Sequence, residues 1–75
     1  MLTDPQFFQE QQAIERLSQH IPFETDPQTK AECIEMLRGL VLRVGMRVNR
    51  ADFGFEARQE LERLGLWERL GGRDG

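Results

Sequence analysis

The chain has 75 residues and a formal net charge of −3, with 39% hydrophobic, 31% charged and 8% aromatic residues. This length allows one small domain, and the composition as a whole is too apolar for a disordered chain and too polar for a membrane protein. A single cysteine excludes an internal disulfide framework and a thiolate zinc cage, and a single histidine excludes most zinc and di-iron sites. We therefore expect no metal and no other cofactor.

The small size makes apolar burial barely sufficient for folding. Burying one apolar side chain stabilises the fold by about 1.5–3 kcal/mol, whereas ordering each residue costs about 1.5 kcal/mol. Without a disulfide or a metal, the usual supplement is a partner surface. We expect the chain to associate with a second copy, with another protein, or with both. A well-packed monomer is the alternative.

The sequence shows no targeting or membrane segment. Its first residues lack the basic region and the long apolar run of a signal peptide, and neither end carries a lipidation motif. The most apolar stretch, residues 40–48, is too short to span a bilayer and is interrupted by two arginines. We therefore expect a soluble, cytoplasmic protein with no membrane partner.

Two copies of one tetrapeptide predict the starts of two helices. Thr-Asp-Pro-Gln occurs at residues 3–6 and again at residues 25–28. Threonine followed three residues later by glutamine forms a capping box, and proline fits the first turn, where its missing N–H would be unpaired anyway. We expect one helix to begin near Asp4 and another at Asp26.

The predicted first helix extends to about Gln19. The proline at position 22 ends it, because the residue before a proline avoids the helical conformation. Its apolar residues recur at helical spacing and form one seam that must pack against another element. These residues are Phe7, Ile14, Leu17 and Ile21.

The predicted second helix has an unusually wide apolar arc. Its apolar stripe, flanked by Leu40 and Leu42, consists of Ala31, Ile34, Leu37, Val41, Val44 and Val48. A helix that is apolar on more than one side is either central in its bundle or self-associating. Residues 40–48 also alternate between apolar and polar side chains, as in a half-buried strand, and Gly39 is a point at which the helix can end. That alternative is an α+β fold in which one strand near residues 40–48 pairs across a dimer.

A third helix is predicted to begin with Asp52 as its N-cap. Gly65 followed by Leu66 resembles a helix C-cap with its trailing hydrophobic contact. A short helical turn follows at residues 67–70. We therefore predict an all-α fold, a small three-helix domain with the second helix at its centre and a short C-terminal helical turn. The domain is predicted to span residues 1–72, with a disordered tail at residues 73–75.

No pattern in the chain predicts a catalytic site. Asp-Phe-Gly at residues 52–54 matches the magnesium-binding tripeptide of protein kinases, but the other kinase loops are absent. We expect Cys33 to act as a small hydrophobe and His20 as a cation at a helix end. Four glutamates have no histidine three residues later and are expected to be solvated rather than metal ligands: Glu10, Glu15, Glu32 and Glu35. We therefore expect no enzymatic activity and no small-molecule substrate.

Three apolar residues near the C-terminus are predicted to contact a partner. On a helical wheel, Phe55 lies nearly opposite the apolar face of the third helix, and Leu66 projects toward the same side if the helix continues. Trp67 is a residue type enriched in the most important contacts of interfaces. The alternatives are that Phe55 packs onto the second helix and that Trp67 closes the end of the core.

Arg43, Arg47 and Arg50 follow one another at i, i+4 and i+7, which places three cations on one face of the second helix. We predict a non-enzymatic protein–protein interaction domain, an adaptor or regulator that self-associates, docks on a larger complex, or both. The arginines would then set orientation and association rate. The alternative is a dimeric nucleic-acid-associated regulator that binds through this arginine stripe. A structural role, with the arginines pairing with acids of the first helix, competes with both.

Overall fold

Three α-helices make up most of residues 5–71, the part of the chain that the computed structural model describes. Helix α1 spans Pro5–His20, α2 spans Pro27–Val44 and α3 spans Phe55–Arg63. Short 3-10 segments complete the fold: η1 (Ile21–Phe23), η2 (Gly45–Arg47), η3 (Arg50–Asp52) and η4 (Trp67–Arg69). The predicted all-α, three-helix fold with a C-terminal helical turn is confirmed, and these residues form no strand. The predicted cap at Thr3, the domain limit at residue 72 and the tail at 73–75 lie outside the described residues.

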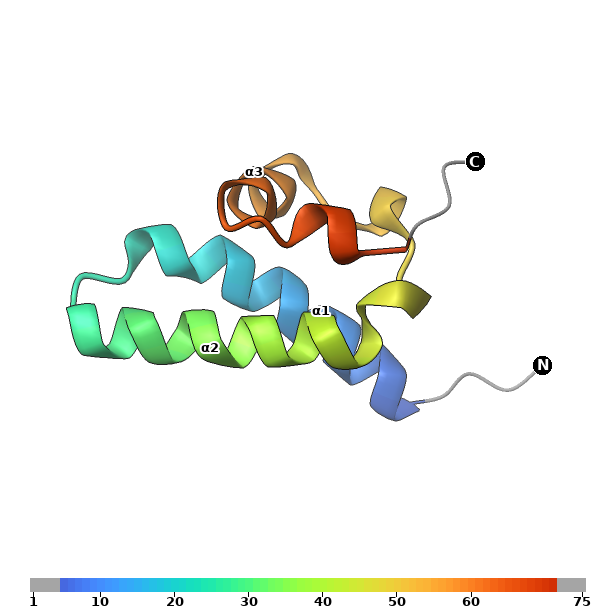
Figure 1. Cartoon of the computed structure of the whole chain (residues 1–75), viewed down its shortest axis with the longest axis horizontal. Helices are drawn as coiled ribbons and strands as arrows, with labels where there is room; N and C mark the ends of the chain where they lie inside the picture. Colours follow the sequence, from blue (N-terminus) through green and yellow to red (C-terminus); the bar gives the residue numbers. More distant parts are fainter. Residues whose placement is uncertain (1–4, 72–75) are drawn as a thin grey trace.

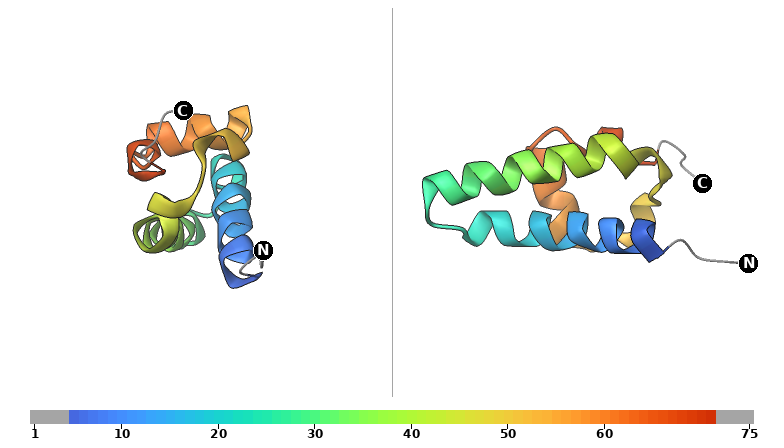
Figure 2. Two further views of the ribbon diagram at one scale, coloured as in Figure 1. Left: turned by 90° about the vertical axis from the view of Figure 1, so that its right-hand side faces the viewer. Right: turned by 90° about the horizontal axis from the view of Figure 1, so that it is seen from below.

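Helices α1 and α2 form an antiparallel hairpin that is closed by η1 (Figure 1). Helix α3 lies across α1, and η4 returns the chain toward α2 (Figure 2). Because α1 packs along α2 and also against α3, α1 is the central helix. The prediction that the second helix is central is therefore wrong. The chain leaves the end of α2 through residues 45–54 and places α3 on α1, so that one flank of the wide α2 arc remains uncovered.

Residues 40–48 continue as helix α2 and then as the 3-10 segment η2, so the strand alternative is wrong. Leu37, Leu40, Val41 and Val44 follow one another at helical spacing and are all buried, as one face of an α-helix requires. A strand would have placed Leu42 on the same side as Val44, but Leu42 is 60% exposed. Gly39 therefore lies inside α2 and does not end it. The chain becomes extended at Val48, where its side chain enters the core.

The helix ends follow the predicted chemistry, with two changes of residue. The N-cap of α2 is Asp26 rather than Thr25, and its carboxylate accepts hydrogen bonds from the Thr29 N–H at 2.9 Å and the Thr29 hydroxyl at 2.6 Å. The N-cap of α3 is Gly54 rather than Asp52. Asp52 belongs to η3, where its carboxylate accepts a 3.1 Å hydrogen bond from the side chain of Gln11 in α1.

The C-terminal end of α3 has the predicted glycine cap. Gly65 adopts the left-handed conformation with a φ of 76°, which glycine tolerates without steric penalty. The Leu66 N–H donates to the Leu61 carbonyl at 2.8 Å and the Gly65 N–H to the Glu62 carbonyl at 3.1 Å, the two bonds of a Schellman motif. This turn reverses the chain and directs η4 back over the core.

One apolar cluster connects all of these elements. Its fully buried members come from α1, η1, α2, α3 and the C-terminal segment, and they include Ile14, Ile21, Leu37, Ala57, Leu61 and Leu70. The Gly71 N–H donates to the Gly45 carbonyl at 2.7 Å, which fixes the C-terminal segment against η2. A Cβ at Gly71 would lie 2.5 Å from the Val48 carbonyl oxygen, so this close approach requires glycine. None of the described helices is both long and apolar enough to cross a membrane.

Substituting Val44 by aspartate is expected to unfold the chain. Val44 is 4% exposed, and an unpaired carboxylate in its place would have no compensating charge or hydrogen bond. Loss of the helical circular dichroism signal and of the cooperative thermal transition would show this. Leu42→Asp places the same charge two residues away on the exposed side of α2 and should remain folded. Retention of the native melting transition by Val44→Asp would contradict the assigned core.

The acid sensitivity of the fold should depend on Asp26. The Thr29 hydroxyl, and after it the Thr29 backbone N–H, donate hydrogen bonds to the Asp26 carboxylate, and these bonds lower the pKa of this carboxyl from its ordinary value. A depressed pKa in the folded state stabilises it above the ordinary carboxyl range, and this stabilisation is lost as the pH falls through the depressed value. Asp26→Asn keeps the cap but does not titrate. Urea titrations across the acid range should show a weaker pH dependence of unfolding for Asp26→Asn. Identical pH profiles for the two proteins would exclude this contribution.

Candidate functional site

Large hydrophobic side chains exposed to solvent are the main candidate contact residues of this domain. A small monomer rarely exposes contiguous apolar surface without using it for binding. The most exposed members are Phe23 in η1 and Phe55 in α3. Others lie on α1, α2 and η2, and the full set is Phe8, Phe23, Met36, Leu42, Met46 and Phe55.

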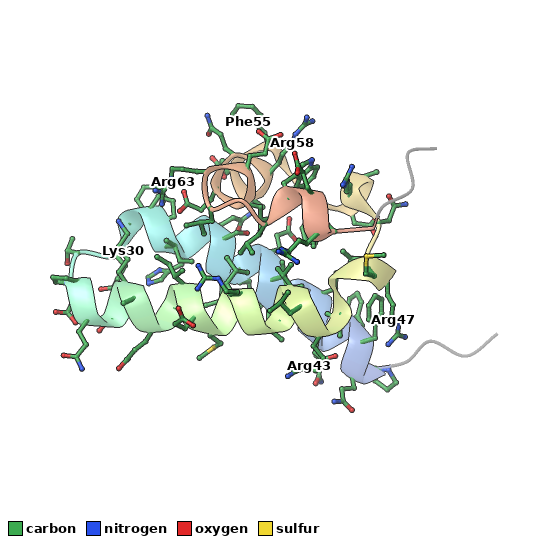
Figure 3. All side chains as sticks on the ribbon, in the orientation of Figure 1. Lys30, Arg43, Arg47, Phe55, Arg58 and Arg63 are labelled. Atoms are coloured by element: carbon green, nitrogen blue, oxygen red, sulfur yellow. The ribbon has the colours of Figure 1, made fainter. Side chains whose placement is uncertain are left out.

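Phe55 occupies the first turn of α3 and points into solvent (Figure 3). Its side chain is 74% exposed, because the core face of this helix is formed by Ala57 and Leu61 on the opposite side. The predicted outward orientation is confirmed, and the alternative that Phe55 packs onto the second helix is wrong. Its role as a partner contact stays a prediction.

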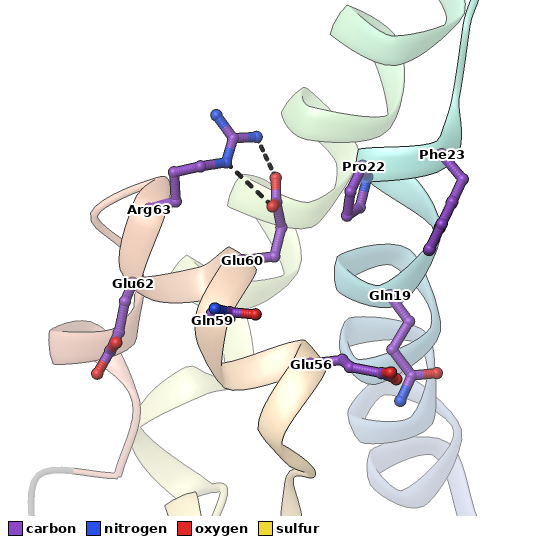
Figure 4. A pocket seen from close by; sticks show the side chains of 8 residues that line it. All are labelled: Gln19, Pro22, Phe23, Glu56, Gln59, Glu60, Glu62 and Arg63. Carbon is purple, nitrogen blue, oxygen red and sulfur yellow. Dashed lines mark hydrogen bonds and ion pairs between the residues drawn. The ribbon is translucent and has the colours of Figure 1, made fainter.

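A groove of about 620 Å³ lies between η1 and α3, and we name it the α3–η1 groove (Figure 4). Pro22 and Phe23 form its apolar side, and Phe23 is 80% exposed. Polar side chains of α1 and α3 form the rest of the lining: Gln19, Glu56, Gln59, Glu60, Glu62 and Arg63. Phe55 precedes Gln59 by one turn of α3 and is not part of this lining.

The α3–η1 groove carries an excess of negative charge. Three glutamates and one arginine line it. Glu60 is 5% exposed and pairs with Arg63, whose Nε donates to Glu60 Oε1 at 3.0 Å. Hydrogen bonding to Glu60 raises the pKa of the Arg63 guanidinium above its ordinary value. Glu62 pairs with Arg58 at 3.0 Å, one turn earlier on the helix. Two of the three glutamates are thus paired with arginines, and the third, Glu56, lies near Gln19 in the same lining.

Leu66 and Trp67 do not form an exposed patch with Phe55, which corrects the sequence prediction. Leu66 is 3% exposed, because the left-handed turn at Gly65 ends the helix and directs Leu66 into the core. Trp67 is half-buried and packs edge-to-face against Phe53, with ring centroids 6.5 Å apart. The alternative in which Trp67 closes the end of the core is the one observed. The guanidinium of Arg58 lies 5.1 Å from the Trp67 ring centroid.

The predicted arginine stripe is also not formed. Helix α2 ends at Val44, so that Arg43, Arg47 and Arg50 belong to α2, η2 and η3 and do not share one helical face. Arg43 pairs with Glu10 of α1 at 2.9 Å, and the Arg47 guanidinium lies 4.3 Å from the Phe7 ring centroid. Arg50 donates to the backbone carbonyls of Leu70 at 3.0 Å and Glu68 at 3.3 Å. These contacts attach the segments after α2 to the rest of the fold.

The acidic residues also differ in part from the prediction of full solvation. Glu10 is only 14% exposed in its side chain, because Arg43 covers it. His20 pairs with Glu24 at 2.9 Å. This hydrogen bond lowers the pKa of the Glu24 carboxyl most, and the hydrogen bond from the Asp26 N–H lowers it further. Residues 5–71 contain no group of three or more His, Cys, Asp or Glu side chains that could hold a metal ion.

Sequence reasoning did not single out Phe23, and it named the wide arc of the second helix without telling which part of it is exposed. Phe23 follows the proline that ends α1, and this position is compatible with either burial or exposure. Leu42 lies beside the apolar stripe of α2 and not in it, and this position indicates exposure. The expectation that the second helix is central pointed instead to burial on several sides. Comparison with protein families, with curated proteins and with solved structures finds no match to this chain.

Truncation to alanine should change the free energy of unfolding strongly at Leu66 and very little at Phe55. Leu66→Ala removes a buried side chain and is expected to lower the free energy of unfolding by about 2–5 kcal/mol. Phe55→Ala changes an exposed side chain and should stay within about 0.5 kcal/mol of the parent. Urea denaturation of the two variants would measure both effects. A large destabilisation by Phe55→Ala would place this side chain in the core.

Proposed function

We propose that this chain is a non-enzymatic protein–protein interaction domain that docks a segment of another protein into the α3–η1 groove. The exposure of Phe23 at the mouth of this groove is the observation that carries the proposal. About four-fifths of the Phe23 side chain is exposed to water in the monomer. Burying it against a partner would stabilise the complex by about 1.5–3 kcal/mol. Phe55, which precedes Gln59 by one turn of α3, is exposed as well.

The charge of the groove indicates what the docked segment contains. An apolar side chain would lie against Pro22 and Phe23, and a lysine or arginine beside it would meet Glu56. Such complementarity increases the association rate and selects the register of the segment. An adaptor or regulator of this kind would act in the cytoplasm, where a free thiol such as Cys33 stays reduced.

The nucleic-acid alternative has less support. A basic patch that binds phosphates needs several cations on one surface. Here Arg43, Arg47 and Arg50 come from three elements, and each contacts a group of the chain itself: Glu10, Phe7 and the backbone of residues 68–70. Their positions support the structural role that competed with the stripe in the sequence.

Selection from a displayed library of random peptides tests the proposal. Peptides enriched on the immobilised chain are expected to combine an apolar residue with lysine or arginine, and Phe23→Ala should weaken their binding about tenfold or more. Gln28→Ala, an exposed substitution in the first turn of α2, is the matched control and should bind normally. Fluorescence anisotropy with the enriched peptides would give both affinities.

Two results would contradict the docking proposal. One is the absence of enriched peptides, and the other is binding that Phe23→Ala leaves unchanged. A labelled duplex oligonucleotide at low salt serves as the second probe. Salt-dependent binding of this duplex, without peptide enrichment, would favour the nucleic-acid alternative.

A further inference from the structure

Helix α2 presents a continuous outward face that the rest of the described chain leaves uncovered. Along this face, residues recur at the spacing of a helix seam. Met36 and Leu42 are each 60% exposed, Met46 just beyond the helix is 73% exposed, and the side chains of Glu35 and Arg43 are more than half exposed. We name these residues the α2 outer face: Glu32, Glu35, Met36, Gly39, Leu42, Arg43 and Met46.

Gly39 lies at the centre of this face and has no evident role within one chain. A Cβ placed on it would meet nothing within 4 Å among the described residues, apart from the local helix backbone. Its φ is not in the left-handed range, so the backbone does not require glycine here. Glycine inside a helix is less stable than alanine. A glycine at this position does, however, allow a second helix to approach closely.

The face is also self-complementary about Gly39. Consider two α2 helices packed antiparallel and related by a two-fold axis that passes between their Gly39 residues. A residue n positions before Gly39 in one copy then lies at the same level as the residue n positions after Gly39 in the other copy. Glu35 therefore faces Arg43 of the second copy, and Met36 faces its Leu42. Both pairings occur twice, once on each side of the axis. A parallel pair would instead place Glu35 against Glu35 and Arg43 against Arg43, which is repulsive.

We propose that the chain forms a homodimer through the α2 outer face, with two α2 helices packed antiparallel and their Gly39 residues in contact. Within one chain Arg43 pairs with Glu10 at 2.9 Å and Glu35 pairs with Arg38 at 2.8 Å. In the dimer each of these exposed pairs would lie beside the other copy's pair, so that Arg43 and the second copy's Glu35 join one charge network. The exposed methionine and leucine side chains supply the apolar contact. The dimer leaves the α3–η1 groove free and does not depend on the docking proposal.

Disulfide trapping tests the arrangement directly. Gly39→Cys is introduced together with Cys33→Ala, which removes the native thiol. At the two-fold axis the new cysteines meet, and the oxidised protein is expected to run as a covalent dimer. Glu32→Cys in the same background is the matched control on the same face. In an antiparallel pair the two residues at position 32 are about 21 Å apart, from seven residues on each side of the axis at 1.5 Å per residue. That separation is far beyond the reach of a disulfide.

The two trapping variants distinguish the possible outcomes. Rapid cross-linking at position 39 and little at position 32 would support the antiparallel dimer. Equal cross-linking at both positions would indicate a parallel pair or random collision, and no cross-linking at position 39 would indicate a monomer. Either of these last two results would overturn the proposal.

Light scattering behind size exclusion over a hundredfold dilution gives the second test. The parent chain should show a concentration-dependent dimer, and Gly39→Glu should increase the dissociation constant about tenfold or more while retaining the helical circular dichroism signal. Gly54→Glu makes the same substitution at an exposed glycine before α3, where a Cβ also meets nothing within 4 Å, and should leave the dimer intact. A parent chain that is monomeric at the highest concentration would exclude self-association. The peptide-binding test of the groove would be unaffected by that result.

Discussion

A single apolar cluster positions every other feature of this domain, because each segment is attached to it by only a few side chains. Ile14 and Ile21 attach α1 and η1, and Leu61 attaches α3. Leu70 attaches the C-terminal segment, supported by the hydrogen bond from Gly71 to Gly45. The orientation of the groove and of the outer face of α2 follows from this shared core.

The arginines show how polar groups complete such a small fold. Arg43 connects α2 with α1 through Glu10, and Arg50 connects η3 with the backbone of the C-terminal segment. The described residues contain no buried side-chain nitrogen or oxygen without a hydrogen-bond partner. Cations that appear from the sequence to form a binding stripe therefore serve mainly to join segments that the helices alone would not hold together.

The two surfaces proposed for partners differ in their chemistry. The α3–η1 groove is concave, acidic and open beside Phe23, which suits an extended segment with apolar and basic residues. The α2 outer face carries both signs of charge and has at its centre a glycine with open space beside it, which suits the proposed second helix. Because the two surfaces lie on different elements, dimer formation through one is compatible with docking at the other. The domain would then present two grooves in each dimer.

The sequence by itself determined the local features: three helices, the proline and glycine residues at their ends, and the apolar stripes that became the core. The conformational preferences of residues and the helical spacing of apolar side chains act within one or two turns, so a single amino-acid sequence is enough to reveal them. The helical wheel also indicated an outward orientation for Phe55, with packing onto the second helix as the alternative. Only the tertiary structure decided that α1 is central, that Leu66 is buried and that the three arginines separate. These features depend on the path of residues 45–54 and on the reversal at Gly65, which bring together residues distant in sequence.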